Sequence, residues 1–435
     1  MSTDGDGEAA ESADGTVVVE TGPDASVDPT DASDGAPVGG ARTATGAEVA
    51  ATSGFSDFFG QRVGLVANRA SVVGERSVID LLAEAEDLEL VSIFAPEHGL
   101  RADAGAGELI EDGVDPVTGL VVHSLFGDVR RPTPEMLAGL DVLVFDLQDV
   151  GARFYTYTAT MGLAMQAAAE ADIPFVILDR PNPLGSGPAG SPRTDDQVSF
   201  VSQYPTPSLH GLTPGELALA VKGEGWLDGL EDLDLRVVPL AGWSRSDPWP
   251  ATGLAWVPPS PGLPSVEATL AYPATVLFEA TTLSYGRGTD HPFQQVGAPW
   301  LDGEALAAAL SAQELAGVRF EPVTFTPTAG AAAIDPQFEG ERVSGVRVVV
   351  EDPTVADQPA VGVHLLAAVQ AQARASAASG DPIEVVDRPA FLDLLTGTPQ
   401  VRLDLDAGRS PVDIVADWQA DLAAFEQIIA PYRLY

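Results

Sequence analysis

Four short apolar runs, each followed by polar residues at the same end, constrain the fold of this chain more than any other feature. They lie within residues 62–68, 88–101, 141–149 and 174–183. In the second, LELVSIFAPEHGLR, the apolar stretch from Leu90 to Ala95 stops at Pro96, because proline cannot continue a central ladder. Runs of this length and composition are typical of strands that are buried on both faces.

Helical periodicity between the runs indicates that the strands are parallel. Residues 77–87 place apolar side chains at helical spacing, and residues 159–171 are rich in alanine. Strands that alternate with helices in this way form a parallel sheet with right-handed crossovers. The carboxyl ends of such strands meet at one edge, where open α/β sheets bind ligands. We therefore expect the following residues to converge there: Asn68, Glu97, His98, Asp146, Gln148, Asp149, Asp179, Arg180 and Asn182.

The changes in composition and pattern along the chain predict a tail and two domains. Residues 1–45 are acidic and poor in aromatic side chains, so they bury too little apolar surface to offset their ordering entropy, and we expect disorder. Residues 46–238 would hold a Rossmann-like catalytic domain, with a long Gly- and Asp-rich loop at 102–125. The mixed helices and strands of residues 239–435, including one helix expected over 412–429, predict a smaller α+β domain that closes a cleft.

Charge and composition exclude several classes of protein. The chain carries 64 acidic and 22 basic residues, a net charge of −42, which argues against nucleic acids or anionic membranes as partners. The acidity fits either a well-solvated surface or adaptation to high salt, where screening relieves self-repulsion. The absence of cysteine excludes disulfides, zinc–thiolate sites and cysteine nucleophiles. No apolar run is long enough for a membrane span, and no secretory signal is visible, so the protein is either cytoplasmic or exported and processed. The oligomeric state is not predicted.

The paired residues Glu97 and His98 are the first candidates for acid–base chemistry. A carboxylic acid in a partly desolvated cleft keeps its proton to higher pH, as protonation of a leaving-group oxygen requires. The alternative is that Glu97 caps a helix or forms a salt bridge, and that His98 is a core histidine. Asp146 and Asp149 could act beside them, although Asp149 could equally form a structural ion pair with Arg153.

Other residues at the predicted edge could bind a ligand or serve the fold. Tyr155 and Tyr157 could stack on a sugar ring or line the core. The run DRPNP, residues 179–183, is either a turn or a set of polar ligands. In SYGRGT, residues 284–289, the glycines around Arg287 would let its guanidinium approach an anion. The sequence has no Walker motif, HExxH or GxSxG, and no GxGxxG follows the first strand, which argues against nucleotide chemistry and a serine-hydrolase elbow.

Five motifs in order resemble the exo-β-N-acetylmuramidase family: PEHG (96–99), DLQDVGARFYTY (146–157), DRPNP (179–183), WVPPSP (256–261) and GRGT (286–289). The resemblance extends from about residue 46 to the closing PYRLY. It implies a Rossmann-like catalytic domain with a smaller C-terminal domain, a site in the cleft between them, and release of terminal N-acetylmuramic acid from the non-reducing end of peptidoglycan fragments. The glutamate of PEHG, here Glu97, would be catalytic. Departures from the family pattern at Leu209, Gly262, Leu263, Thr282, Tyr285, Asp290, His291 and Gln294 gather where the C-terminal domain would face the cleft.

The leading hypothesis is therefore a glycosidase that needs neither a cofactor nor a metal. Glu97 would protonate the glycosidic oxygen with His98 beside it, and Asp146 or Asp149 would support the oxocarbenium-like state or position water. The expected substrate-binding residues are Asn68, Arg153, Tyr155, Tyr157, Asp179, Arg180, Asn182, His210, Ser284 and Arg287. Two alternatives remain open, a sugar-binding protein that has lost activity and a metal-dependent hydrolase built on the same four acidic and histidine residues.

Overall fold

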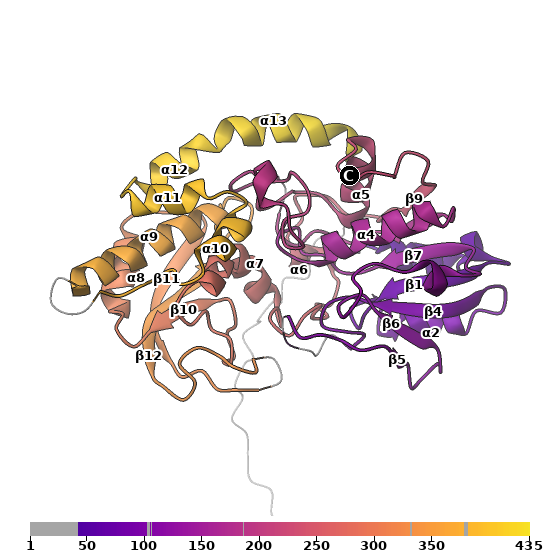
Figure 1. Cartoon of the computed structure of the whole chain (residues 1–435), viewed down its shortest axis with the longest axis horizontal. Coiled ribbons are helices and arrows are strands. Elements are labelled where there is room, and N and C mark those ends of the chain that lie inside the picture. The colour runs from indigo at the N-terminus through magenta and orange to yellow at the C-terminus, as the bar shows by residue number, and fades with distance from the viewer. Residues whose placement is uncertain (1–41, 102–104, 106, 186, 331–332, 378–381) are drawn as a thin grey trace, which may run out of the picture. The chain divides into compact units, whose positions relative to one another are not determined.

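The computed structural model describes residues 42–435, apart from 102–104, 106, 186, 331–332 and 378–381 (Figure 1). The expected disordered tail thus lies outside the described residues up to residue 41. Its last four residues belong to the fold instead. The Thr43 N–H donates to the carbonyl of Thr252, Ala44 pairs with Ala241, and the Thr45 hydroxyl caps helix α1 (Gly46–Thr52).

A seven-stranded sheet forms the first half of the described chain. Its order is β5 (Gly113–Val114), β6 (Val121–Ser124), β4 (Glu89–Ala95), β1 (Arg62–Ala67), β7 (Val142–Asp146), β8 (Phe175–Leu178) and β9 (Leu235–Val238). Every neighbouring pair is parallel except β5 and β6. The prediction of an α/β fold with a parallel sheet is confirmed.

Apolar side chains alternate between two cores on the faces of this sheet. In β1, Val63 and Leu65 belong to one core and Val66 to the other. The first face is covered by α1, by η1 (Ser56–Phe58) and by α2 (Val78–Ala83), and the second by α3 (Pro134–Leu137), α4 (Tyr157–Glu170) and α5 (Pro214–Gly223). Burial of both faces explains why the strands read as continuous apolar runs.

The prediction of a long loop over residues 102–125 is wrong at its C-terminal end. Strand β6 lies there and pairs with β4 from Ser92 to Ala95. Its four residues, VVHS, are too few to give a periodic signal, and their pairing partner lies some thirty residues earlier in the chain. Helix α5 begins with a capping box, in which the Thr213 hydroxyl accepts from the Glu216 N–H.

The second half is α+β, as predicted. An antiparallel sheet has the order β10 (Gln295–Ala298), β12 (Val343–Val350) and β11 (Val318–Phe325). Its helices are α7 (Val266–Thr275), α8 (Gly303–Ser311), α9 (Gln358–Ala377), α10 (Pro389–Thr396), α11 (Gln400–Asp406), α12 (Pro411–Asp417) and α13 (Gln419–Ile429). The single helix expected over 412–429 is thus two helices, which meet at Trp418. Shorter elements are β2 (Val72–Val73), β3 (Arg76–Ser77), η2 (Asp195–Gln197), α6 (Trp249–Thr252), η3 (Val276–Ala280) and η4 (Ala430–Tyr432).

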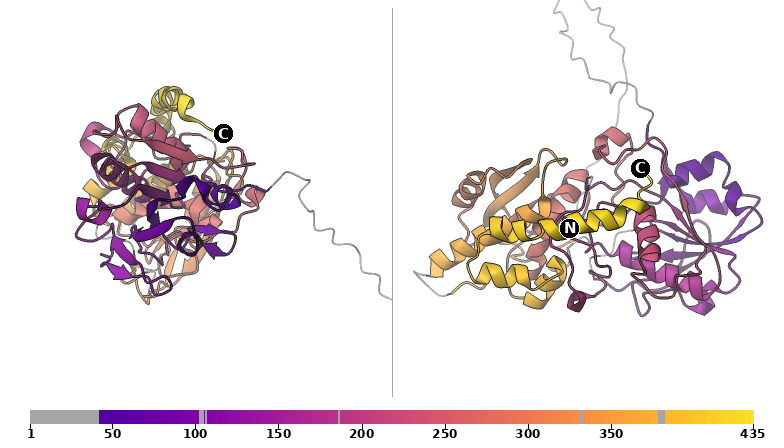
Figure 2. Two further views of the ribbon diagram at one scale, coloured as in Figure 1. Left: turned by 90° about the vertical axis from the view of Figure 1, so that its right-hand side faces the viewer. Right: turned by 90° about the horizontal axis from the view of Figure 1, so that it is seen from above.

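The C-terminal residues return to the first sheet, as α13 and the end of the chain beside α5 show in Figures 1 and 2. Phe425 of α13 stacks on Trp226 with ring centroids 6.0 Å apart. The Tyr435 hydroxyl donates to Asp179 Oδ2 at 2.8 Å, and the Leu434 N–H donates to a carboxylate oxygen of Glu216. The described residues form one compact unit, so the domain division near residue 238 stays a prediction.

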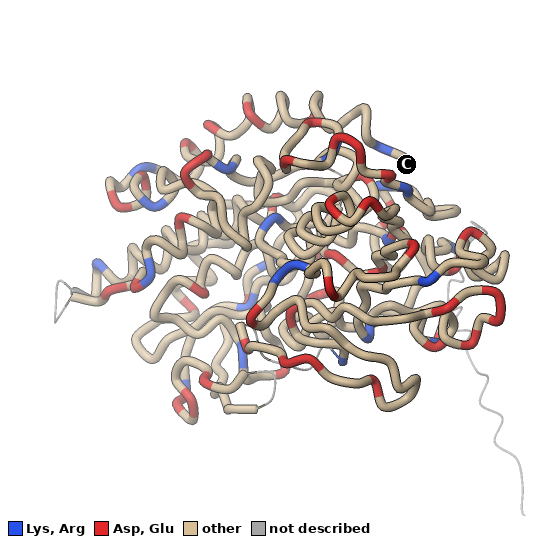
Figure 3. Tube along the Cα trace, turned by 45° about the vertical axis from the view of Figure 1, so that its right-hand side comes forward, with Lys and Arg blue, Asp and Glu red and all other residues tan. Residues whose placement is uncertain are grey.

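Acidic residues are spread along all parts of the described chain rather than confined to one segment (Figure 3). Most arginines form ion pairs with them, such as Arg409 with Asp404 and Asp417. None of the helices in the described ranges is long and apolar enough to cross a membrane.

Candidate active site

A cavity of about 380 Å³ lies at the carboxyl ends of β4, β6 and β7. The loops after these strands contribute Glu97, His98, Gly107, Phe126, Arg130, Phe154, Tyr155 and Thr156, and the segment between β8 and α5 contributes Phe200 and Val201. The second half of the chain contributes Ser260, Gly262, Leu263, Tyr272, Glu279, Tyr285, Arg287, Phe293, Arg388 and Phe391. Both halves of the chain therefore build this cavity, and three of the departures from the family pattern line it.

Glu97 reaches the cavity because β4 ends at Ala95, just before Pro96. Its side chain is held on both oxygens: the Gly107 N–H donates to Oε1 at 2.8 Å and the Thr156 hydroxyl donates to Oε2 at 2.7 Å. Glu97 is 7% exposed, so few positions are left to its carboxyl group. His98 follows in the left-handed region, with φ 71°, and lines the same cavity. This backbone is uncommon for a residue with a side chain and is often found at functional sites.

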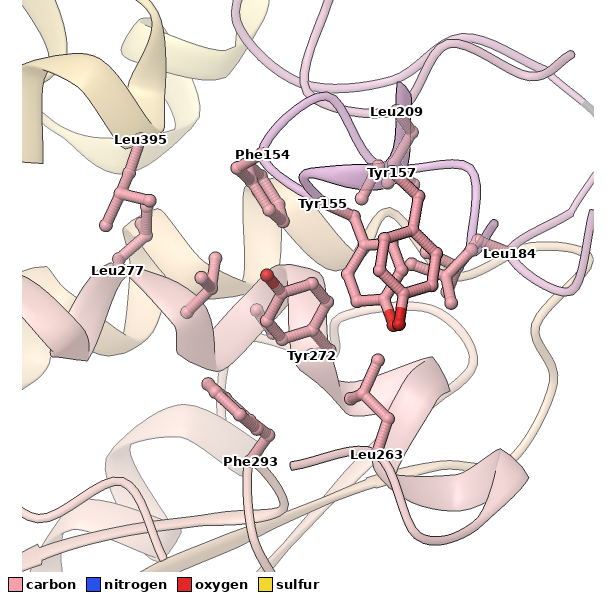
Figure 4. Close-up of a cluster of buried hydrophobic side chains, with 14 of the residues drawn as sticks. Phe154, Tyr155, Tyr157, Leu184, Leu209, Leu263, Tyr272, Leu277, Phe293 and Leu395 are labelled. Atoms are coloured by element: carbon pink, nitrogen blue, oxygen red, sulfur yellow. The ribbon is translucent and has the colours of Figure 1, made fainter. Parts of the chain in front are cut away.

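Aromatic side chains form one wall of the cavity (Figure 4). Tyr272 lies at the centre of this wall, with its ring edge-on to Phe154 at 5.3 Å and to Phe293 at 4.8 Å between centroids. Tyr155 packs edge-on against Tyr157 at 4.7 Å. Rings in these orientations give a rigid apolar surface of the kind on which the face of a sugar can rest.

Glu279 is a cavity residue that the sequence analysis did not single out. It lies in η3, and its carboxyl group shares the cavity with Glu97. Burial raises the pKa of Glu279, the Arg287 and Arg388 guanidinium groups oppose this rise, and the Glu97 carboxylate adds to it. The sequence does show Glu279 as a single acidic residue within the apolar run from Val276 to Ala280. A local pattern, however, does not show which distant residues lie opposite this carboxyl group.

Asp146 lies away from the cavity and is fully buried in an ion pair. Arg180 donates from Nε to Oδ1 at 2.5 Å and from Nη2 to Oδ2 at 2.9 Å, and it also reaches the carbonyl of Val72. Burial raises the pKa of Asp146, and Arg180 opposes the rise. The arginine occupies both oxygens, so a substrate could reach them only by displacing it.

Asp149 and Arg153 are also buried, but they do not form the ion pair that was considered as an alternative. Asp149 Oδ2 accepts from the Gly151 N–H at 2.7 Å and lies 3.5 Å from His210 Nε2. Arg153 instead donates to the carbonyls of Ser191, Thr206 and Leu395. These contacts tie the loop after β7 to neighbouring loops and to α10, and neither Asp149, Arg153 nor His210 lines the cavity.

Asp179 lies at the N-terminus of α5 and is satisfied by its surroundings. Its oxygens accept from the Thr213 hydroxyl, the Gly215 N–H and the Tyr435 hydroxyl at 2.7–2.8 Å. Burial raises its pKa to about 6 against these hydrogen bonds. Asn182 Oδ1 accepts from the Leu184 N–H two residues on, as in a turn, and its amide donates to the carbonyl of Leu212.

The remaining predicted residues also divide into those that line the cavity and those that do not. Asn68 donates to the Tyr157 hydroxyl at 2.8 Å, and both side chains are buried outside the cavity. Ser284 is buried beside a smaller neighbouring cavity. The structure therefore brings Glu97, His98, Tyr155 and Arg287 together in the lining of the cavity. The other ten predicted site residues do not line it, although one of them, Tyr157, packs against Tyr155 from behind the cavity.

A metal site is not evident in the part of the chain that the structure describes. No three His, Asp or Glu side chains there are grouped so that they could hold an ion. The four residues considered for a metal-dependent hydrolase do not converge, because Asp146 pairs with Arg180 and Asp149 with His210.

Comparison with known proteins gives consistent results for both halves. Residues 63–267 match the family model described as exo-beta-N-acetylmuramidase NamZ, N-terminal, and residues 270–435 match its C-terminal counterpart. The chain is 38% identical over 378 residues to the peptidoglycan beta-N-acetylmuramidase NamZ of Bacillus subtilis, covering 86% of this chain and 87% of that protein.

Two crystal structures from Bacteroides fragilis, both of DUF1343 family proteins, have the same fold. The first has a TM-score of 0.82 at 37% identity and covers 91% of this chain and 99% of the other. The second has a TM-score of 0.73 at 33% identity and covers 90% and 99%.

Proposed function

The chain belongs to the exo-β-N-acetylmuramidase NamZ family, and we propose that it is a glycoside hydrolase that releases terminal N-acetylmuramic acid from the non-reducing end of peptidoglycan fragments. The observation that carries this proposal is the Glu97 carboxyl group, which is fixed by Thr156 and Gly107 within a cavity built by both halves of the chain. A cavity of about 380 Å³ suits one terminal sugar rather than the middle of a glycan chain.

We assign proton donation to Glu97. Glycoside hydrolysis needs one carboxyl group that protonates the leaving-group oxygen and a second group that supports the oxocarbenium-like state or directs water. Glu279, rather than Asp146 or Asp149, is placed for the second role because it lines the same cavity. The cations of Arg287 and Arg388 favour its ionised form, which that role requires.

The substrate-binding surface in this proposal consists of Tyr155, Tyr272 and Phe293 for the sugar face and Arg287 for polar groups. The other predicted binding residues hold the loops in place. We also propose that residues 46–238 carry the catalytic glutamate, and that residues 239–435 close the cavity and supply Glu279.

The test is turnover of an aryl glycoside of N-acetylmuramic acid by the wild-type protein and by Glu97→Gln. General acid catalysis contributes about 10²–10⁴-fold, so we expect a loss of kcat of that size. With a dinitrophenyl leaving group, which needs little protonation, most of the loss should disappear. Glu111→Gln, an exposed glutamate outside the cavity, is the matched control and should behave as the wild type. Equal rates for Glu97→Gln and the wild type would remove Glu97 from the mechanism, and binding without turnover by the wild type would indicate a sugar-binding protein.

A further inference from the structure

Arg130 stands apart from most arginines of this acidic protein. It lines the same cavity as Glu97, and within the described ranges it forms no ion pair with any carboxylate. Its neighbour Arg131, by contrast, pairs with Glu170 outside the cavity. Within the described ranges the charge of Arg130 thus has no carboxylate partner, although the chain carries a net charge of −42.

Two aromatic rings hold the Arg130 side chain in place. The centre of its guanidinium group lies 4.6 Å from the ring centroid of Phe200 and 5.1 Å from that of Phe126. The two rings are themselves tilted by 43° with centroids 5.9 Å apart, so they form a pocket for the cation. Stacking on the faces of a guanidinium leaves its N–H groups at the edge, where they match the two oxygens of a carboxylate. The side chain is thus ordered before any ligand arrives, which lowers the cost of binding.

The other two arginines of the cavity, Arg287 and Arg388, come from the second half of the chain. Arg287 and Arg388 both act on Glu279, which comes from the same half of the chain. Arg130 comes from the loop after β6, in the half that also provides Glu97, so its charge remains for a ligand. N-acetylmuramic acid differs from N-acetylglucosamine by a lactyl ether that carries one carboxylate.

We propose that Arg130, clamped by Phe126 and Phe200, binds the lactyl carboxylate of the terminal sugar and so selects N-acetylmuramic acid over neutral amino sugars. This assignment rests on the proposed function. It also explains how a strongly acidic protein accepts an anionic substrate: the local cation offsets the repulsion that the rest of the surface exerts.

The experiment compares Arg130→Gln with Arg131→Gln, which removes the same charge one residue away and outside the cavity. Both variants are assayed on three aryl glycosides: N-acetylmuramic acid, the same sugar with its carboxyl group converted to an amide, and N-acetylglucosamine. For the acid we expect Arg130→Gln to lower kcat/KM by about 10- to 100-fold, mainly through KM, since a charge-assisted hydrogen bond is lost. The amide and the neutral sugar should be turned over equally by all three proteins. Phe200→Leu, which keeps the charge but loosens the clamp, should give a smaller loss for the acid alone.

The outcomes separate this inference from the function on which it depends. If the wild type and Arg131→Gln do not turn over the muramic acid glycoside, the proposed function fails. If they do and Arg130→Gln matches them, only the role of Arg130 is refuted. An equal loss on all three glycosides would show a structural effect instead of carboxylate recognition.

Discussion

The buried pair Asp146–Arg180 gives the sharpest test of the distinction between structural and catalytic residues at the sheet edge. Both side chains are almost inaccessible, with 0% and 4% of their surface exposed, and the arginine contacts both carboxylate oxygens. In Arg180→Met the carboxylate loses its partner while remaining in the interior. Removing one partner of a buried pair costs about 3–5 kcal/mol, a large part of the roughly 5–15 kcal/mol by which a protein is stable.

The pH dependence of this loss is part of the prediction. Burial already raises the pKa of Asp146, and the group that opposes this rise, Arg180, is absent from the variant. In Arg180→Met the Asp146 carboxylate should therefore take up a proton as the pH falls. The loss in free energy of unfolding should be largest at pH 8, where Asp146 is charged, and smaller at pH 5. The double variant Asp146→Leu/Arg180→Met removes both charges and should recover most of the lost stability.

The assay is urea unfolding at pH 5 and pH 8, with kcat on the muramic acid glycoside measured under conditions in which each variant is folded. The control is Arg236→Met, which breaks an exposed pair with Asp234 and should cost at most about 1 kcal/mol. Arg180→Met should lose stability but keep its kcat when folded. An unchanged free energy of unfolding, or a folded variant with its kcat abolished, would refute the structural assignment and return Asp146 to the candidates for catalysis.

Three further predictions concern protons and salt. Because burial raises the pKa of Glu279, kcat/KM should fall with decreasing pH at a higher pH than for an ordinary glutamate, and Arg388→Gln should move this limb higher still; a pH–rate profile unchanged in the variant would contradict the role of Glu279. The pKa of Asp179 rises from 3.8 to about 6 on folding, so its protonation stabilises the folded state below pH 4, and about 3 kcal/mol should be lost between pH 4 and 7 relative to Asp179→Asn. If the free energy of unfolding, measured with urea, depends on pH in the same way for the wild type and Asp179→Asn, the raised pKa of Asp179 is refuted. If the net charge of −42 reflects adaptation to salt, the melting temperature should rise in molar KCl, and no rise would favour a merely well-solvated surface.

The sheet could be predicted from the sequence because its signals are local. The run from Leu90 to Ala95 and the breaker Pro96 define a strand and its end without reference to any other part of the chain. The same local reasoning placed Glu97 at the carboxyl edge. It could not locate β6, since four residues acquire strand structure through pairing with β4 rather than through their own pattern.

The division of the edge residues could not be predicted, because it depends on partners that are distant in the sequence. Asp179 looks as available as Glu97 in the sequence, yet its Oδ2 accepts from Thr213 and from Tyr435, the last residue of the chain, and its Oδ1 accepts from the Gly215 N–H. Glu279 is the opposite case. Nothing near it in the sequence indicates catalysis, and it becomes a candidate only because the second half of the chain folds over the loop that carries Glu97.

The topology of the sheet supplies the missing criterion. The chain begins with β1 in the middle, continues through β4 and β6 on one side, and then crosses to β7, β8 and β9 on the other. The loops after β4 and β7 therefore diverge from the end of β1, and open α/β sheets bind ligands in the crevice at such a switch point. Glu97 follows β4 and Thr156 lies in the loop that follows β7, so the 2.7 Å hydrogen bond between them spans this crevice. Asp179 follows β8, one strand farther out, where α5 and the C-terminal residues cover the edge. Strand order thus separates Glu97 from Asp179, whereas Asp146, at the end of β7, is kept from the cavity by its ion pair with Arg180.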